Sequence, residues 1–185
     1  MEKVAAMSEN SIRVPNELLL SEIGRLLAQG KRCSLRTKGS SMLPFIRGER
    51  DSVVLEALPE ILAGDIVLAK VPGRGYVLHR VMRIEGERLF LMGDGNLRYG
   101  EECSLCDVLG SVVWIEKDCG GGLKLPENPE DQEVFRRAHP RIFVDPRSPG
   151  QLRKARLWRL LKPFRRLILA VYRRTLLAVG NGELN

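Results

Sequence analysis

Three side chains of this sequence could act together as a nucleophilic catalyst. Ser41 lies in the segment Gly-Ser-Ser-Met-Leu-Pro, His79 in Leu-His-Arg-Val, and Asp94 in Gly-Asp-Gly-Asn. A serine hydroxyl becomes a nucleophile when a neighbouring base takes its proton, and a carboxylate on the far side of that base orients it. These residue types therefore predict a Ser/His/Asp site, provided that the fold brings the three segments together.

The segment around Ser41 predicts a tight corner in the backbone. Gly39 and Pro44 flank the serine, and such a corner can hold the hydroxyl exposed while the Ser41 N–H points at a substrate carbonyl. The alternative is an ordinary surface turn, because Gly, Ser and Pro are common turn residues.

His79 and Asp94 belong to a predicted strand and a predicted turn. Strand alternation places His79 on the apolar face of Val77 and Val81, where a general base is shielded from solvent. Asp94 follows the next strand, and a hairpin could bring its carboxylate beside the imidazole. The alternatives are a histidine that only packs in the core and an Asp-Gly pair that only forms a turn.

The elements that must position these residues are mostly β-strands. Strands are predicted at 33–37, 52–56, 65–70, 76–84, 88–92 and 109–116. Several short strands without intervening helices favour a small antiparallel barrel or folded sheet. A helix is predicted at 15–29, because Pro15 suits a first helical turn and Gly30 suits a C-terminal stop.

Composition divides the chain into four parts. They are an N-terminal helical segment (1–30), a β domain (31–117), a Pro/Gly-rich linker (118–150) and a basic amphipathic helix with a tail (151–185). The first 14 residues are charged and contain no continuous apolar run, so no signal peptide is expected. No stretch approaches the roughly 20 uncharged apolar residues that span a bilayer, which predicts a cytosolic or membrane-peripheral protein.

Positive charge is concentrated near the C-terminus. The formal net charge is +7, and residues 146–182 hold ten Lys and Arg and no acidic residue, which leaves 7 − 10 = −3 for the rest. An apolar stripe at helical spacing runs opposite the basic face. It consists of Leu157, Leu160, Leu161, Phe164, Ile168 and Val171. Pro163 predicts a kink or the start of a second helix.

Three interpretations of this basic helix remain open. It can pack on its own domain, lie in the plane of an anionic membrane surface through residues 151–179, or bind another partner. The positive charge is a property of the C-terminal part alone, which localises any anionic partner to that part. A nucleic-acid partner is not expected.

The four cysteines do not indicate a disulfide scaffold in a chain of 185 residues. Cys103 and Cys106 have the spacing of metal ligands, but zinc takes four ligands, so Cys33 and Cys119 would have to join them. We expect ordinary thiols, and neither a metal nor another cofactor.

The ordered motifs resemble the S24/S26 peptidase superfamily, which contains type I signal peptidases and self-cleaving repressors. The resemblance rests on Gly-x-Ser-Met-x-Pro around Ser41, Gly-Asp-Ile-Val at 64–67, His-Arg-Val at 79–81 and Gly-Asp-x-Asn at 93–96. It covers about residues 36–116, roughly half of the chain. It implies a mainly β catalytic fold of the signal-peptidase/LexA type, with an N-terminal and a C-terminal helix appended here.

The same resemblance implies roles for individual residues. Ser41 matches the serine nucleophile, and His79 occupies the position of the general base, as in the archaeal and endoplasmic-reticulum signal peptidases; bacterial signal peptidases and the repressors have lysine there. Asp94 matches the first aspartate of the Gly-Asp-Asn-Asn motif of those histidine enzymes. Those enzymes also use a second aspartate shortly downstream. This chain has Glu101 and Glu102 in that region instead. We therefore predict that Asp94 orients His79, with Glu101 as the alternative.

The implied function is a serine endopeptidase that cleaves a leader-type or signal-type peptide. Arg80 is expected to form a salt bridge or to face solvent rather than to act chemically.

Two other functions stay open, a self-cleaving LexA-like regulator and a non-catalytic peptide-binding module of the same fold. Roughly 30 residues with one helix are too few for a helix-turn-helix domain, and His79 also counts against the regulator. Family signal peptidases carry an N-terminal membrane helix, whereas residues 15–29 predict a short charged one.

Overall fold

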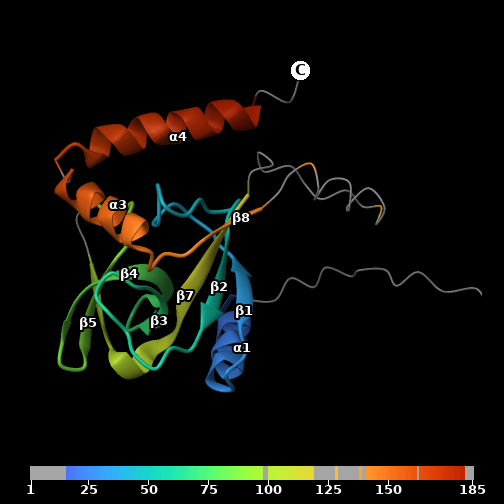
Figure 1. Ribbon diagram of the computed structural model, residues 1–185, viewed down its shortest axis with the longest axis vertical. Helices are drawn as coiled ribbons and strands as arrows, with labels where there is room; N and C mark the ends of the chain where they lie inside the picture. The colour runs from blue at the N-terminus through green and yellow to red at the C-terminus, as the bar shows by residue number, and fades with distance from the viewer. Residues whose placement is uncertain are drawn as a thin grey trace, which may run out of the picture.

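The computed structural model of the chain describes residues 16–97, 100–118, 128, 138, 141–161 and 163–181. Its centre is one curled antiparallel sheet of eight strands (Figure 1), in the order β1-β2-β7-β3-β4-β5-β6, with β8 paired to β7. The strands are β1 (Cys33–Arg36), β2 (Ser52–Glu56), β3 (Ile66–Val71), β4 (Gly75–Glu85), β5 (Arg88–Met92), β6 (Glu101–Ser104), β7 (Val108–Lys117) and β8 (Ile142–Val144). A 3-10 turn, Leu105–Asp107, joins β6 to β7.

The prediction of a mainly β chain with an N-terminal helix is confirmed. Each predicted strand is present, and its ends differ from the predicted ones by at most one residue. Two strands were missed, β6 (Glu101–Ser104) and β8 (Ile142–Val144). The strand β6 begins with two adjacent glutamates and gives no apolar alternation, and β8 has only three residues.

The N-terminal helix α1 (Asn16–Ala28) packs against the sheet and closes one side of its core. Ile23 and Leu27 are buried with Leu55, Leu68 and other strand residues in one apolar cluster. The helix ends at Ala28, and Gly30, two residues later, has a φ of 74°, the left-handed conformation that stops helices. The predicted helix at 15–29 is thus confirmed for the residues that the structure describes.

The basic C-terminal segment forms two helices, so of the two outcomes expected at Pro163, a kink or the start of a second helix, the second is confirmed. They are α3 (Pro149–Leu160) and α4 (Arg165–Asn181), and α3 lies between α4 and the sheet (Figure 1). Trp158 and Leu169 are buried against Leu43, so both helices pack on the part of the chain that carries Ser41. Most of the linker predicted at 118–150 and the end of the tail lie outside the described residues. Within the described residues, none of the helices combines the length and the apolar run that a membrane span requires.

Candidate active site

Ser41 lies in the turn between β1 and β2, and a close backbone contact fixes this turn. Gly39 has a φ of 75°, and a Cβ on Gly48 would lie only 2.0 Å from the carbonyl oxygen of Gly39. The two sides of the turn can therefore touch only because residue 48 has no side chain. The Thr37 hydroxyl adds a hydrogen bond of 2.8 Å to the carbonyl oxygen of Asp51. The predicted corner is present, and Ser41 is half-buried within it.

A buried carboxylate holds the base of the same turn. Asp51 is fully buried and forms ion pairs of 2.7 Å with Arg47 and 2.8 Å with Lys117. Burial favours the neutral acid, but the hydrogen bonds from Arg47 and Lys117 outweigh it and hold the pKa of Asp51 below its usual value. Asp51 is therefore charged at neutral pH, and it ties the turn to β7 through Lys117.

His79 lies on β4, with only 3% of its surface exposed, on the apolar face that the sequence predicts. Its Nδ1 makes a hydrogen bond of 2.8 Å with Oε2 of Glu101, which is also buried. The other carboxylate oxygen of Glu101 lies 2.6 Å from Arg74. Glu101 therefore fixes the orientation of the imidazole and leaves Nε2 directed away from it.

The carboxylate beside His79 is Glu101, the alternative, and not Asp94 as predicted. Asp94 is buried, but its oxygens accept bonds of 2.9 Å and 2.7 Å from the Arg80 guanidinium. The expected salt bridge of Arg80 is thus present, and the expected contact between Asp94 and His79 is not.

Strand register explains why the two carboxylates have different partners. Arg80 is paired with Met92, and Asp94 lies two residues after Met92. The Arg80 guanidinium and the Asp94 carboxylate therefore lie on the same face of the sheet. Val81 is paired with Leu91, and Leu91 with Glu101, which places Glu101 on the opposite face. His79 shares that opposite face because it lies two residues from Val81.

The environment of His79 keeps the imidazole ready to accept a proton. Burial lowers the pKa of His79 below its ordinary value, although the Glu101 carboxylate acts in the opposite direction. A lowered pKa means that the neutral imidazole, which is the base, persists to a more acidic pH than in a free histidine.

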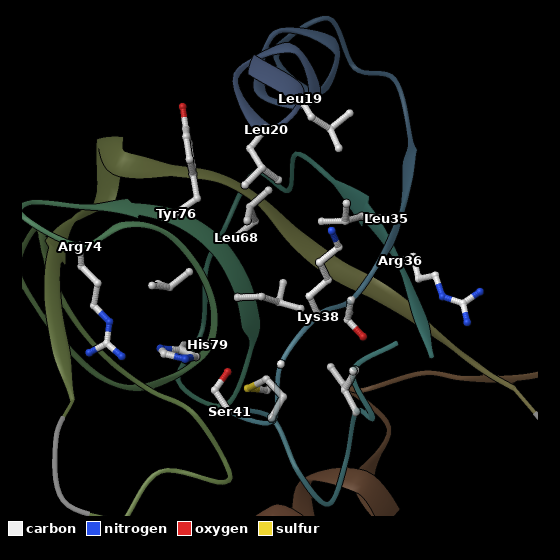
Figure 2. Close-up of a pocket in the computed structure, with 17 residues that line it drawn as sticks. Leu19, Leu20, Leu35, Arg36, Lys38, Ser41, Leu68, Arg74, Tyr76 and His79 are labelled. Atoms are coloured by element: carbon white, nitrogen blue, oxygen red, sulfur yellow. The ribbon is translucent and has the colours of Figure 1, made fainter. Parts of the chain in front are cut away.

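Ser41 and His79 line one cavity of about 960 Å³. In Figure 2 the Ser41 side chain lies next to the His79 ring at one end of this cavity. A Cβ on Gly93 would lie 3.0 Å from Nε2 of His79 and 2.5 Å from the carbonyl oxygen of Ser41, so Gly93 contacts both residues. No hydrogen bond joins the Ser41 hydroxyl to His79 among the residues described here, and such bonds often tighten only when substrate binds.

Gly93 is expected to be essential for this arrangement. A Gly93→Ala methyl group must displace the Ser41 carbonyl or the His79 ring, because both lie within 3.0 Å of its position. A displacement of about 1 Å can cost about 100-fold in rate, and we expect a loss of that order in kcat/KM for peptide cleavage. Gly150→Ala is the matched control, since nothing lies within 4 Å of its Cβ. Equal rates for both variants would contradict the arrangement.

Asp94 and Arg80 form a structural centre on the other face of β4. The Arg80 guanidinium also donates to the carbonyl oxygen of Gly64 at 2.7 Å and lies over the Phe45 ring. The indole N–H of Trp158 donates to the carbonyl oxygen of Asp94 at 2.7 Å. This centre connects the turn at Asp94, the Ser41 turn and the C-terminal helix α3.

Removal of the Asp94 carboxylate is expected to destabilise the fold. Asp94→Ala leaves a guanidinium that is only 3% exposed without its anion, and the expected loss in free energy of unfolding is about 3 kcal/mol. Glu102→Ala is the control, since Glu102 pairs with Arg88 at the surface and should cost less than about 1 kcal/mol. Denaturant unfolding measures both, and similar losses for the two variants would refute the structural role.

The described residues include no group of three or more His, Cys, Asp or Glu side chains that could hold a metal ion. Cys103 is buried on β6, Cys106 is exposed and Cys33 is half-buried. Burial raises the pKa of the Cys103 thiol to about 11, so it is not a reactive thiolate. Cys119 lies outside the described residues.

Comparison with known proteins adds no relative to this picture: no family model, no curated protein and no solved structure matches the chain.

Proposed function

We propose that this protein is a serine endopeptidase with Ser41 as nucleophile, His79 as general base and Glu101 as the group that orients the base. The observation that carries the proposal is the buried pair of His79 and Glu101, in which the second ring nitrogen of His79, Nε2, lies against Gly93 beside the Ser41 turn. A histidine that only packed in the core would not need a buried carboxylate on one nitrogen and an open cavity at the other. We assign the chain, on its motifs, to the signal-peptidase/LexA type of fold.

In the proposed mechanism, Ser41 attacks the peptide carbonyl while Nε2 of His79 takes the hydroxyl proton. The imidazolium that forms is stabilised by Glu101, 2.8 Å from Nδ1. The proton then passes to the leaving amine, and water hydrolyses the acyl-enzyme by the reverse sequence of proton transfers. The N–H of Ser41 has no acceptor among the described residues and can donate to the oxyanion of the tetrahedral intermediate.

The lining of the cavity suits an extended peptide with aliphatic side chains. Its wall away from Ser41 is formed by residues of α1 and the strands, namely Leu19, Leu20, Leu35, Leu68 and Tyr76 (Figure 2). Leu78 also lines the cavity. Arg36, Lys38 and Arg74 also line it, and no carboxylate does so in the described part of the chain. We therefore expect cleavage within apolar, leader-type segments, and exclusion of cationic side chains from this cavity.

A peptide library digested with the purified protein tests this function. Mass spectrometry of the products should reveal new termini that cluster after aliphatic sequences, and these products should be missing with Ser41→Ala. Cleavage of the protein's own chain and of nothing else would favour the self-cleaving regulator. Binding of library peptides without any cleavage would favour the non-catalytic module.

A further inference from the structure

The C-terminal helices present a second apolar surface that the sheet does not cover. Their inner side is buried through Ala155, Trp158 and Leu169. Their outer side is exposed, with Leu160 at 79% and Leu167 at 69%. The exposed residues follow the spacing of one helix side. We call them the outer apolar patch: Leu157, Leu160, Phe164, Leu167, Ile168 and Val171.

The patch contains every residue of the stripe that the sequence predicts except Leu161, which is half-buried. Packing on the domain is achieved mainly by Trp158 and Leu169, which the sequence had not singled out, with Leu161 packed against them. The expectation of a helix packed on its own domain is therefore correct for one side of α3 and α4 and leaves the other side unexplained. Scattered exposed leucines are ordinary, but a run of this length on adjoining helices marks an interaction surface.

The charges around the patch indicate what it contacts. Exposed basic side chains accompany it on both helices: Arg153, Lys154, Arg156, Arg166 and Arg174. None of these forms an ion pair with a carboxylate in the part of the chain that the structure describes. Residues 146–182 contain no acidic residue at all, which favours a strongly anionic partner over a protein surface of mixed charge.

We propose that the outer apolar patch and its basic border dock the protein on an anionic lipid surface, with α4 lying in the plane of the membrane interface. Apolar side chains on one side and Lys or Arg beside them are the composition of interfacial helices. Figure 1 supports the geometry, since α4 lies along the outside of the molecule, with α3 between it and the sheet. The apolar side chains enter the interface, and the basic side chains bind lipid phosphates.

This proposal does not depend on peptidase activity. The inactive variant Ser41→Ala should bind vesicles as the wild type does, whereas patch variants should lose binding while they still cleave a soluble peptide. Failure of docking and failure of the proposed activity are therefore distinguishable.

Vesicle flotation with the full chain tests the docking. Wild-type protein should float with vesicles that contain phosphatidylglycerol, and not with phosphatidylcholine alone. Binding should fall as salt is raised, because surface charges are screened. The double variant Phe164→Glu/Leu167→Glu should bind at least about tenfold more weakly, and Arg153→Gln/Lys154→Gln/Arg156→Gln should lose roughly fivefold for each charge removed.

Leu62→Glu/Leu105→Glu is the matched control, since these leucines are exposed at 47% and 44% outside the patch. It should bind vesicles as the wild type does. Unchanged thermal unfolding of the patch variants shows that the fold survives. Three results would overturn the proposal: equal binding to neutral and anionic vesicles, full binding by the patch variant, or a patch-dependent dimer or DNA complex without vesicle binding.

Discussion

Replacement of Ser41 by alanine is expected to abolish peptide cleavage, with a fall in kcat/KM of about 10⁴-fold or more. Ser41 supplies the attacking oxygen, and the close contact between Gly39 and Gly48 fixes the turn that carries it. Kinetics on a peptide identified from the library would measure this loss.

Ser40→Ala is the control for this prediction. Ser40 is the neighbouring residue and is exposed, so its loss removes a hydroxyl from the same turn without removing the proposed nucleophile. Full cleavage by the Ser41→Ala protein would refute the mechanism, and equal losses in both variants would show that the turn, not the nucleophile, was disturbed.

The second large effect is expected at Glu101. Glu101→Gln keeps the shape of the side chain but removes the charge that stabilises the His79 imidazolium, and the expected loss in kcat/KM is about 10²-fold to 10⁴-fold. Glu102→Gln is the matched control, because Glu102 is the adjacent residue and pairs with Arg88 at the surface.

The pH profile separates this orienting role from simple damage to the fold. The Glu101 carboxylate raises the pKa of His79 against the larger effect of burial. Its removal lets the pKa of His79 fall further, so the imidazole stays neutral to lower pH. The acidic limb of kcat/KM should therefore lie below the ordinary histidine value in the wild type and move to still lower pH in Glu101→Gln. A limb that stays in place would contradict the contact.

Part of this site could be predicted from the sequence because strand alternation is a local property. The pattern around His79 correctly placed the imidazole on the buried face with Val77 and Val81. The glycines and proline around Ser41 likewise predicted a tight turn. In both cases the information lies within a few neighbouring residues.

The orienting carboxylate could not be predicted in this way, because it depends on the pairing of three strands. Glu101 reaches His79 only because β6 pairs with β5 and β5 pairs with β4 in one register. The strand β6 begins with two adjacent glutamates and gives no apolar alternation. Glu101 can be inferred once that pairing is known, because the register then places it on the face of Val81.

The C-terminal helices show a related limit. Helical periodicity finds an apolar stripe, but it cannot tell which of two apolar sides a domain will cover. The domain covers the side of Trp158 and Leu169, since Leu43 and the carbonyl oxygen of Asp94 offer them contacts. The longer stripe remains exposed, and we expect its binding partner to be another molecule.

The most direct test of the proposed site needs no substrate. In the Ser41→Cys protein, the new thiol should be activated by His79, since a neighbouring base or imidazolium lowers the pKa of a thiol. Its alkylation by iodoacetamide near pH 6.5, followed by mass spectrometry, should be at least about tenfold faster than that of the exposed Cys106 in the same chain. The additional change His79→Gln should remove this advantage. A thiol at position 41 that reacts no faster than Cys106, or that reacts equally fast without His79, would contradict the catalytic pairing of these two residues.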